Sequence, residues 1–423
     1  MTENHAELRY PTQIIFSLIA EADQEIGEVW LLLGTSQKNC APRIIRRRVS
    51  DFKAAQSVDV RWIFDFYQEN LLPPGGELWW QWELKAQNGA STLYTEKQSI
   101  TLQDQRYNWK KINNGTVDLW WVEGDYTFGA DLSALAYQAL SEVNLRTGMS
   151  LPAQVRMIVY PNIEQMQDAL PYLPDWSAAV AMPEYGLIIA GLAPGETGWA
   201  HQIITHEMAH LLSSGLTFNC LGAQIPTWLS EGISVSAEPE IHLQAEQEVL
   251  NALKHNALPA LRTLTGSFAS NQRQADLAYT QSGMTVRYLL ETYGQADFQD
   301  FLTRIAAGKM VDTALNEVYG LTTDSLDNSW RSSLGFSNSA ALAQVAALTL
   351  PTLPPTVLPP PTPATPQPTA QPTVISMLPT PAAPVPAATT GREELPPALA
   401  GGILLAVIGG VFWAMRHRRE AQP

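Results

Sequence analysis

The first hundred residues of the chain alternate between apolar and polar positions with a period of two. Runs rich in β-branched and aromatic residues are separated by polar or turn-forming stretches, a pattern that predicts short β-strands. Along one run, Trp80 and Trp82 share a face with the leucines on either side, which favours burial in a core over an exposed carbohydrate-binding platform. We expect strands at 12–20, 26–33, 43–49, 58–64, 77–85, 92–95 and 99–102.

Six to seven strands within about 95 residues are typical of an immunoglobulin- or fibronectin-like β-sandwich. Turn sequences at 72–76 (Leu-Pro-Pro-Gly-Gly) and 87–90 (Gln-Asn-Gly-Ala) separate the later strands. The Cys–Trp–Cys pattern of a true immunoglobulin domain is absent from the sequence. We therefore predict a β-sandwich over residues 10–105.

Beyond residue 105, strands alternate with stretches of helical period. Asp131 could cap a helix that ends at Gly148, because the apolar residues between them recur at helical spacing. The run Gly186–Gly191 is the last expected strand, and past residue 231 the chain is mostly helical. These elements predict an α+β domain over residues 106–335. Its other expected strands are 117–122 and 155–160, and its later helices are 163–170, 278–294, 298–307, 311–319 and 326–334.

The end of the chain has a different composition. No charged residue occurs between Arg331 and Arg392, and residues 336–395 are rich in Pro, Thr and Ala, which predicts a disordered linker. The uncharged apolar run 396–415 is long enough to span a bilayer as one helix. The basic tail 416–423 follows directly, and the positive-inside rule places it in the cytoplasm. We therefore expect a single-pass protein of the cell membrane whose α+β domain, residues 106–335, is extracytoplasmic.

An extracytoplasmic domain requires an export signal. None is visible in residues 1–10, which contain two glutamates and no apolar core. We expect that translation starts upstream of Met1, and a tail-anchored protein that faces the cytoplasm is the alternative. Peptide mapping of the native N-terminus distinguishes the two.

Composition narrows the classes of function. The formal net charge is −15, although only 16% of the residues are charged. A nucleic-acid partner would require clustered Lys and Arg, so we expect none. The two cysteines, Cys40 and Cys220, could form an interdomain disulfide, but buried free thiols are the favoured expectation.

The candidate chemistry lies in the segment Trp199–Leu212, which contains His206-Glu-Met-Ala-His210. Residues four apart lie on the same face of a helix, so His206 and His210 can bind one metal ion. Glu207 lies beside that face, where it can act as a general base toward metal-bound water. We expect this helix to end before Gly215. The alternative is a core helix whose two histidines make ordinary hydrogen bonds.

A second segment, Pro226–Gly232, supports the metal-site interpretation. Proline suits the first turn of a helix, and Trp228 and Leu229 would anchor that helix in the core. Glu231 would then face the two histidines. Two imidazoles and one carboxylate leave a fourth tetrahedral position open for water, which is the ligand set of a catalytic zinc site. We therefore predict one Zn²⁺ ion.

Together, the two motifs resemble those of the gluzincin zinc metallopeptidases. H-E-x-x-H and W-L-S-E-G stand 20 residues apart, counted between His210 and Glu231, and are most similar to aminopeptidase-N-like and bacterial peptidase MA-like proteins. The resemblance covers about residues 117–335 and implies a thermolysin-like α+β fold. It also implies His206, His210 and Glu231 as zinc ligands. In the same family pattern, Glu207 is the general base.

Two features of that family are missing. The chain has no Gly-x-Met-Glu-Asn segment, with which the aminopeptidases hold a substrate's free amino group, so the choice between endo- and exopeptidase activity stays open. The thermolysin pattern has an aspartate four residues after the glutamate ligand, where this chain has Val235. The groups that orient the histidines must therefore differ from those of thermolysin.

The resemblance suggests two further roles. Related aminopeptidases use a tyrosine on the helical side of the cleft to stabilise charge on the carbonyl oxygen, and Tyr279 is our candidate, whereas Tyr288 fits a core position better. By analogy, Gly186–Gly191 would be the edge strand that pairs with the substrate backbone. The remaining histidines that we interpret as structural or surface residues are His201, His242 and His255.

We therefore predict a membrane-anchored, zinc-dependent peptidase that hydrolyses peptides or proteins with a metal-activated water and Glu207 as general base. Its second partner would be the lipid bilayer, through residues 396–415. One alternative is a non-catalytic cell-surface binding or adhesion protein with a metal-bearing domain, and another is a zinc hydrolase for a different bond. The sequence defines neither the substrate, nor the oligomeric state, nor the role of the β-sandwich.

Overall fold

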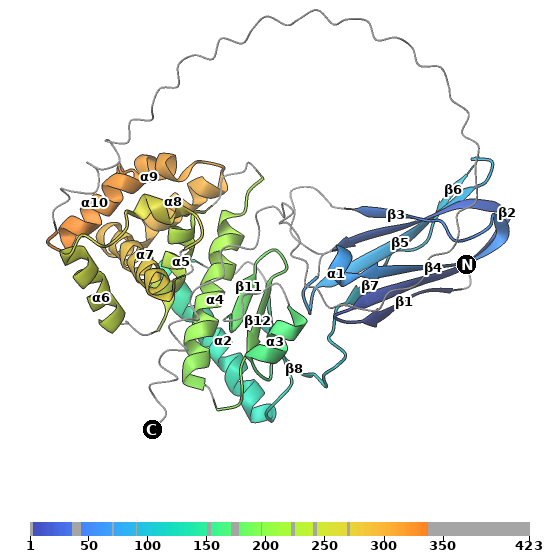
Figure 1. Cartoon of the computed structure of the whole chain (residues 1–423), viewed down its shortest axis with the longest axis horizontal. Coiled ribbons are helices and arrows are strands. Elements are labelled where there is room, and N and C mark those ends of the chain that lie inside the picture. The colour runs from blue at the N-terminus through green and yellow to red at the C-terminus, as the bar shows by residue number, and fades with distance from the viewer. Residues whose placement is uncertain are drawn as a thin grey trace, which may run out of the picture. The chain divides into compact units, whose positions relative to one another are not determined.

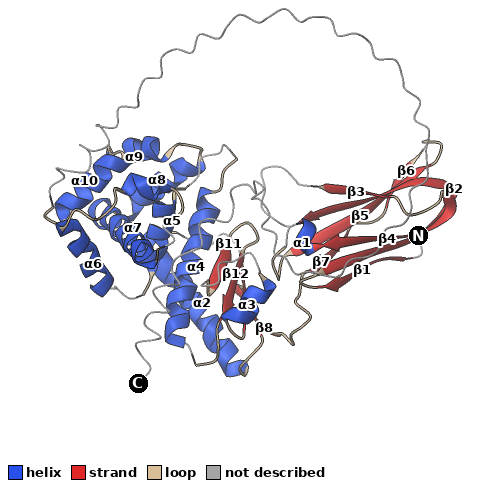
Figure 2. Cartoon of the chain, viewed as in Figure 1, coloured by secondary structure: helices blue, strands red, loops and turns tan. Residues whose placement is uncertain are grey.

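The computed structural model describes two folded parts of the chain (Figure 1). The first part consists of strands and one short helix, and the second combines a sheet with helices, which confirms the predicted α+β class (Figure 2). The linker beyond Phe336, the predicted membrane span 396–415 and the tail 416–423 lie outside the described residues. Among the residues that are described, no helix is both long and apolar enough to cross a membrane. The described residues are 3–35, 44–69, 72–89, 91–149, 154–170, 177–195, 197–220, 225–239, 243–268 and 271–336.

The first domain is built around one long strand, β2, which belongs to an antiparallel sheet of seven described strands. The first half of β2 pairs with β1 and β4, and its second half pairs with β3 and β5. Strands β6 and β7 pair with β5, and the short helix α1 follows β4. The bounds are β1 (Glu3–Arg9), β2 (Gln13–Thr35), β3 (Ile45–Val49), β4 (Ala55–Asp65), α1 (Phe66–Glu69), β5 (Glu77–Ala86), β6 (Thr92–Tyr94) and β7 (Gln98–Thr101).

Strand β2 corrects the prediction of separate strands at 12–20 and 26–33. The polar residues between them contain no Gly or Pro, and the chain continues through them as a strand with a register shift between Glu21 and Ile26. All the described strands of the first domain therefore join one hydrogen-bonded sheet, and the predicted sandwich of two separate sheets is not confirmed. Strand β1, which has little apolar alternation, was not expected and moves the start of the domain from residue 10 to residue 3.

The tryptophans of β5 confirm the predicted core. Trp80 and Trp82 are both buried, and each indole N–H donates a hydrogen bond to Oδ1 of Asn4, at 2.9 and 3.1 Å. These bonds join β5 to the unexpected strand β1. Trp79 lies on the other face of β5, where the ammonium of Lys97 stands 3.9 Å from its ring centroid.

The second domain contains a five-stranded sheet in the order β11-β12-β10-β9-β8. The three central strands are parallel, and the outer strands β8 and β11 run antiparallel to their neighbours. The strands are β8 (Lys110–Asn113), β9 (Val117–Trp121), β10 (Val155–Tyr160), β11 (Ala179–Met182) and β12 (Leu187–Gly191). The helices are α2 (Tyr126–Thr147), α3 (Ile163–Ala169), α4 (Thr197–Thr217), α5 (Thr227–Ala237), α6 (Leu243–Lys254), α7 (Gln272–Tyr293), α8 (Gln295–Ala306), α9 (Val311–Tyr319) and α10 (Thr323–Ser333), with a 3₁₀ turn at Leu261–Thr265.

Two boundaries of the second domain differ from the predictions. Helix α2 begins after Asp125, whose carboxylate accepts a hydrogen bond from the N–H of Phe128, so Asp125 is the cap rather than Asp131. The helix ends as expected at Gly148, which has a φ of 72°. Helix α4 continues to Thr217, so Gly215 lies inside it.

One edge of the second sheet is β11, and the predicted edge strand 186–191 is an interior strand. That run forms β12, which is hydrogen-bonded to β10 on one side and to β11 on the other. The sequence did not reveal β11 because its four residues, Ala-Val-Ala-Met, show no period-two alternation of apolar and polar side chains. All of β11 and β12 except Met182 is buried.

Hydrogen bonds connect the first domain to the sheet and helices of the second. The hydroxyl of Tyr10 donates to the carbonyl of Ala169 at 3.2 Å, and the guanidinium of Arg156 donates to the carbonyl of Gly75 at 2.7 Å. One buried apolar cluster also includes residues from the strands of both domains. The end of β5 that follows Gly75 is therefore the end next to the second domain.

Candidate metal centre

Helix α4 carries both histidines of the H-E-x-x-H motif on its inner side. His206, Glu207 and His210 are almost completely buried. The apolar side chains that alternate with them are also buried, so the helix is held in the core along its length. These apolar residues are Ile203, Ile204, Met208, Leu211 and Leu212.

Helix α5 carries the third candidate ligand. It begins after Pro226, and Trp228 and Leu229 are buried in the main core of the second domain, as expected. Glu231, one turn further on, is completely buried and faces α4. The anchoring tryptophan and leucine thus fix the direction in which the carboxylate points.

Glycine at position 232 sets how closely α5 approaches α7. A Cβ atom at Gly232 would lie 2.6 Å from the carbonyl oxygen of Ser282 and 2.6 Å from a methyl group of Val286. On the other helix, a Cβ atom at Gly283 would lie 2.4 Å from a methyl group of Val235. Only glycine at these two positions allows the two backbones to pack at this distance.

Replacing Gly232 with Ala is therefore expected to destabilise the second domain by about 1–3 kcal/mol, because the helix that carries Glu231 must move away from α7. Thermal unfolding of the full chain measures this change. Gly215→Ala is the matched control, because Gly215 is also helical and a Cβ atom there would have no neighbour within 4 Å. That control should leave stability unchanged or raise it slightly. Equal effects of the two substitutions would contradict the close-packing explanation.

The three candidate ligand atoms converge on one point. The Nε2 atoms of His206 and His210 are 3.2 Å apart, and Oε2 of Glu231 lies 3.4 Å from the first and 3.3 Å from the second. Atoms that bind a tetrahedral zinc ion at about 2.0–2.1 Å are roughly 3.3–3.4 Å from one another. The triangle formed by the two nitrogens and the oxygen therefore has the dimensions of one face of a zinc coordination tetrahedron.

The carboxylate of Glu231 provides a test of whether a cation fits this place. Both of its oxygens are buried, and neither has a hydrogen-bond partner among the described residues. A buried carboxylate without partners is costly, and such charges are normally paired or coordinate a metal. The donor set of two imidazoles and one carboxylate is also the one that zinc prefers at catalytic sites. The residues present therefore fit a zinc ion.

Each candidate histidine ligand is oriented by a second residue, Ser230 in α5 and Glu238 directly after it. Nδ1 of His206 is 2.8 Å from Oε1 of Glu238, and Nδ1 of His210 is 3.1 Å from the hydroxyl of Ser230. The other carboxylate oxygen of Glu238 accepts a hydrogen bond from the side chain of Gln202 at 2.9 Å. With Nδ1 held in this way, Nε2 of both rings is directed at the same point as Glu231.

Glu238 was missed in the sequence, although a signal for it exists. It follows Glu231 by seven residues, which is two turns of a helix and the same face. The sequence prediction considered only position 235, where the thermolysin pattern has an aspartate and this chain has Val235. In this chain, Glu238 at the C-terminal end of α5 fills the corresponding role toward His206.

The candidate general base is bound to the edge strand of the sheet. Oε2 of Glu207 accepts a hydrogen bond from the backbone N–H of Ala181, in β11, at 2.7 Å. Burial raises the pKa of Glu207 above its ordinary value, although the charges of His210 and His206 oppose the shift. A raised pKa brings a carboxylate closer to the range in which it can both accept and release a proton near neutral pH.

Tyr279 lies in the second turn of α7 and is buried. Its ring packs edge-on against Phe268, with 4.7 Å between ring centroids. The pKa of its phenol is raised well above the ordinary value, first by burial and then by the negative charges of Glu231 and Glu207. Its phenol is therefore protonated at neutral pH and under the electrostatic influence of both site carboxylates.

Among the described residues, no other histidine and no cysteine belongs to this group of candidate ligands. His201 pairs with Glu142 of α2 at 3.0 Å, and His255 contacts the backbone carbonyl of Asn251, which agrees with structural roles. His242 lies outside the described residues. Cys220 is disulfide-bonded, contrary to the favoured expectation of free thiols, and Cys40 is outside the described residues.

Comparison with known proteins gives one family match. Residues 135–335, nearly half of the chain, match the model of the Peptidase MA superfamily. No curated protein sequence matches the chain. This match agrees with the resemblance to gluzincin metallopeptidases that the two motifs predicted.

Solved structures similar to this chain include a zinc metallopeptidase and an aminopeptidase. An M1 zinc metallopeptidase from Deinococcus radiodurans is 13% identical over 75% of this chain and 89% of its own, with a TM-score of 0.33. Aminopeptidase A of Legionella pneumophila, in complex with aspartic acid, is 10% identical over 75% of this chain and 47% of its own, with a TM-score of 0.35. A third structure, BhCBM56, is 13% identical over 24% of this chain and 94% of its own, with a TM-score of 0.17.

Proposed function

We propose that the second domain of this chain is a zinc metallopeptidase that hydrolyses peptide bonds at the centre formed by α4 and α5, and the match of residues 135–335 to the Peptidase MA superfamily model supports this proposal. The observation that carries this proposal is the convergence of His206 and His210 with the otherwise unpartnered carboxylate of Glu231. These three residues would hold one zinc ion. When bound there, zinc would activate a water molecule and polarise the scissile carbonyl.

The remaining groups supply proton transfer and charge stabilisation. Glu207 would take the proton from the attacking water and pass it to the nitrogen of the leaving amine. Its hydrogen bond from the backbone N–H of Ala181 holds one carboxylate oxygen in place. Tyr279 would donate a hydrogen bond to the carbonyl oxygen as negative charge develops on it. Glu238 and Ser230 would keep the two imidazoles oriented.

Strand β11 is the surface along which the substrate backbone would lie. The N–H of Gly191 donates to the carbonyl of Ala178, so by antiparallel alternation the backbone groups of Ala179 and Ala181 point away from β12. One of these outward groups, the N–H of Ala181, already reaches Glu207. A peptide that extends the sheet along this edge would therefore place its backbone beside the candidate base.

We further propose that the protein is anchored in a membrane by residues 396–415, with its folded domains outside the cytoplasm. The sequence supports this location through an uncharged apolar run followed at once by basic residues. The disulfide at Cys220 also supports it, because disulfides persist in oxidising compartments. Protease accessibility of the catalytic domain on intact cells tests the location, and protection of the domain would contradict it.

Removal of metal tests the peptidase proposal directly. Treatment of the full chain with a chelator is expected to abolish cleavage of a denatured protein substrate, and added zinc should restore it, because water activation requires the ion. A peptide-library cleavage profile of the restored enzyme would then define its substrate class and distinguish endo- from exopeptidase action. Zinc binding without cleavage anywhere in a broad library would favour the alternative of a non-catalytic binding protein.

Replacing Tyr279 with Phe is expected to lower kcat by about 10²–10³-fold and to change KM little, because the lost hydrogen bond acts mainly on the developing oxyanion. Steady-state kinetics with a short peptide substrate measures the effect. Tyr288→Phe, in the same helix, is the matched control and should retain nearly full activity. Comparable losses in the two variants, or none in Tyr279→Phe, would contradict the assigned role.

A further inference from the structure

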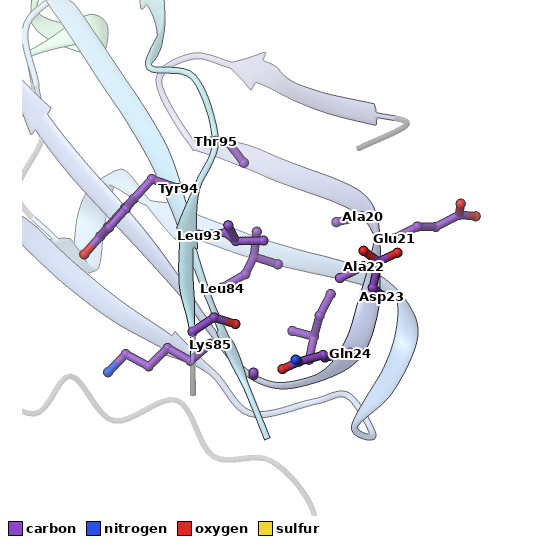
Figure 3. Close-up of a pocket in the computed structure, with 13 residues that line it drawn as sticks. Ala20, Glu21, Ala22, Asp23, Gln24, Leu84, Lys85, Leu93, Tyr94 and Thr95 are labelled. Atoms are coloured by element: carbon purple, nitrogen blue, oxygen red, sulfur yellow. The ribbon is translucent and has the colours of Figure 1, made fainter. Parts of the chain in front are cut away.

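A cavity of about 380 Å³ lies in the first domain, away from the candidate metal centre (Figure 3). It is formed where β2 bends, between that bend and strands β5 and β6. Figure 3 shows Leu84 and Leu93 side by side, with Ala20 and Ala22 of the bend opposite them. Aliphatic side chains therefore form one part of its lining, and polar or charged side chains, including Gln24, Ser91 and Thr95, contribute to the rest. Its volume falls at the low end of the range for ligand-binding pockets.

Strand β6 forms one side of this cavity and has an open edge. Ser91 and Thr95 are hydrogen-bonded through their backbones to β5, at 3.0 and 2.9 Å. In an antiparallel pair these bonds alternate along the strand, so the N–H and C=O groups of Thr92 and Tyr94 point away from β5. Within the described part of the chain, β5 is the only strand that pairs with β6. An open edge of this kind is a template for a further strand.

The rim of the cavity is acidic. Glu21 and Asp23, on the bend of β2, are exposed, and neither forms an ion pair with a described residue. Lys85, the one cation in the lining, is already 3.6 Å from Glu83 and 3.8 Å from Glu28. A ligand with a cationic group would therefore meet two carboxylates at the entrance.

We propose that β6 and this cavity bind an extended peptide segment by strand addition. Its backbone would pair with Thr92 and Tyr94, an apolar side chain would enter the cavity beside Leu93, and a Lys or Arg would lie against Glu21 and Asp23. Main-chain pairing suits an extended polypeptide, because its backbone can continue the alternating hydrogen bonds of the sheet at the open edge of β6. We expect the bound segment to be a part of the peptidase substrate that lies far from the bond to be cleaved. This identification rests on the proposed function.

The cavity lies too far from the second domain for a short peptide to reach both. Strand β5 runs for ten residues, about 33 Å, from its end next to the second domain to the end that lines the cavity. A pentapeptide is at most about 18 Å long and cannot occupy both the cavity and a cleft in the second domain. Binding at β6 should therefore matter for long substrates only.

The test uses the full chain carrying Glu207→Gln, so that probes are not cleaved. The probe is the capped peptide acetyl-Thr-Val-Lys-Val-Thr-Val-Lys-amide, and its control has alternate backbone amides methylated. Hydrogen exchange should show that the unmethylated peptide protects the amides of Thr92 and Tyr94. The methylated control peptide should bind the chain at least about tenfold more weakly. Protection confined to other parts of the chain, or equal binding of the two peptides, would overturn the proposal.

Substitution of the cavity wall gives a second readout. Leu93→Asp should remove probe binding, whereas Ile63→Asp should not, and both side chains are similarly exposed, at 56% and 54%. In the chain with Glu207 intact, Leu93→Asp should raise KM for a long unfolded substrate and leave pentapeptide turnover unchanged. If Leu93→Asp binds the probe as well as the unsubstituted chain does, the site is excluded. The proposal is also overturned if a soluble hexasaccharide protects the amide of Thr92 from exchange and the peptide does not.

The two proposals can fail independently. If the wild-type chain cleaves no peptide while the probe protects β6 as described, the peptidase proposal fails and the β6 site stands as a peptide-binding site. If peptides are cleaved but no probe protects β6, the peptidase proposal stands and the β6 site does not.

Discussion

Replacing Glu207 with Gln is expected to lower kcat by about 10²–10⁴-fold while zinc remains bound. The side chain is not one of the three converging ligands, so its loss should not empty the metal site. Glutamine keeps the size of the side chain and can still accept the hydrogen bond from Ala181, but it cannot take a proton from water. The chemical step should therefore be affected far more than folding or substrate binding.

The measurement is kcat for a short peptide together with zinc content and thermal unfolding. Glu142→Gln is the matched control, because Glu142 also contacts a histidine of α4, His201, yet has no part in the proposed site. It should retain nearly full turnover. Wild-type turnover in Glu207→Gln would rule out the role of general base, and loss of zinc from that variant would show that its effect is structural.

Replacing Glu231 with Gln is expected to have a far larger effect with metal than without it. In the metal-free protein the carboxylate is buried and accepts no hydrogen bond from a described residue, which opposes its charge. The nearby rings of His210 and His206 favour the charge and keep the pKa of Glu231 below its ordinary value, so removing the charge should change the melting temperature little. With zinc present, the variant loses one of three protein ligands. Loss of a residue that only orients a ligand, as Glu238 orients His206, typically lowers metal affinity by roughly 10–100-fold. Loss of the ligand Glu231 itself should lower the zinc affinity by more than this. Activity should fall accordingly.

Thermal unfolding of both proteins as a function of zinc concentration separates these effects. Ligand that binds only the folded state raises the melting temperature, so the wild-type chain should be stabilised progressively by zinc. Glu231→Gln should show little or no stabilisation over the same range. An equal response of both proteins would place the metal elsewhere, and a large loss of stability in the metal-free variant would mean that Glu231 has a structural partner.

Local sequence was sufficient to predict the residues of the centre. H-E-x-x-H places His206 and His210 on one helical face, and Trp228 and Leu229 anchor the next helix so that Glu231 faces them. Each of these inferences depends on the geometry of a single helix or on one buried anchor. The structure brings these residues together as the sequence indicated, and their roles in metal binding and catalysis remain proposals.

What could not be predicted depends on contacts between distant segments. Strand β11 is too short and too uniformly apolar to show a period, and only its pairing with β12 identifies it as the edge. The bend of β2 depends on its pairing with β4 and β5, because its polar residues suggest a turn when considered alone. Glu238 is an intermediate case, because helical periodicity places it on the face of Glu231 but only the structure shows its contact with His206.

The central claim is that two imidazoles and one carboxylate hold a single zinc ion between α4 and α5. Zinc-edge X-ray absorption of the purified full chain, loaded with one equivalent of zinc, tests this claim most directly. We expect two imidazole nitrogens and at least one oxygen, each about 2.0–2.1 Å from the metal, with no sulfur ligand. A shell without imidazoles, a shell that contains sulfur, or failure to retain one equivalent of zinc would contradict it.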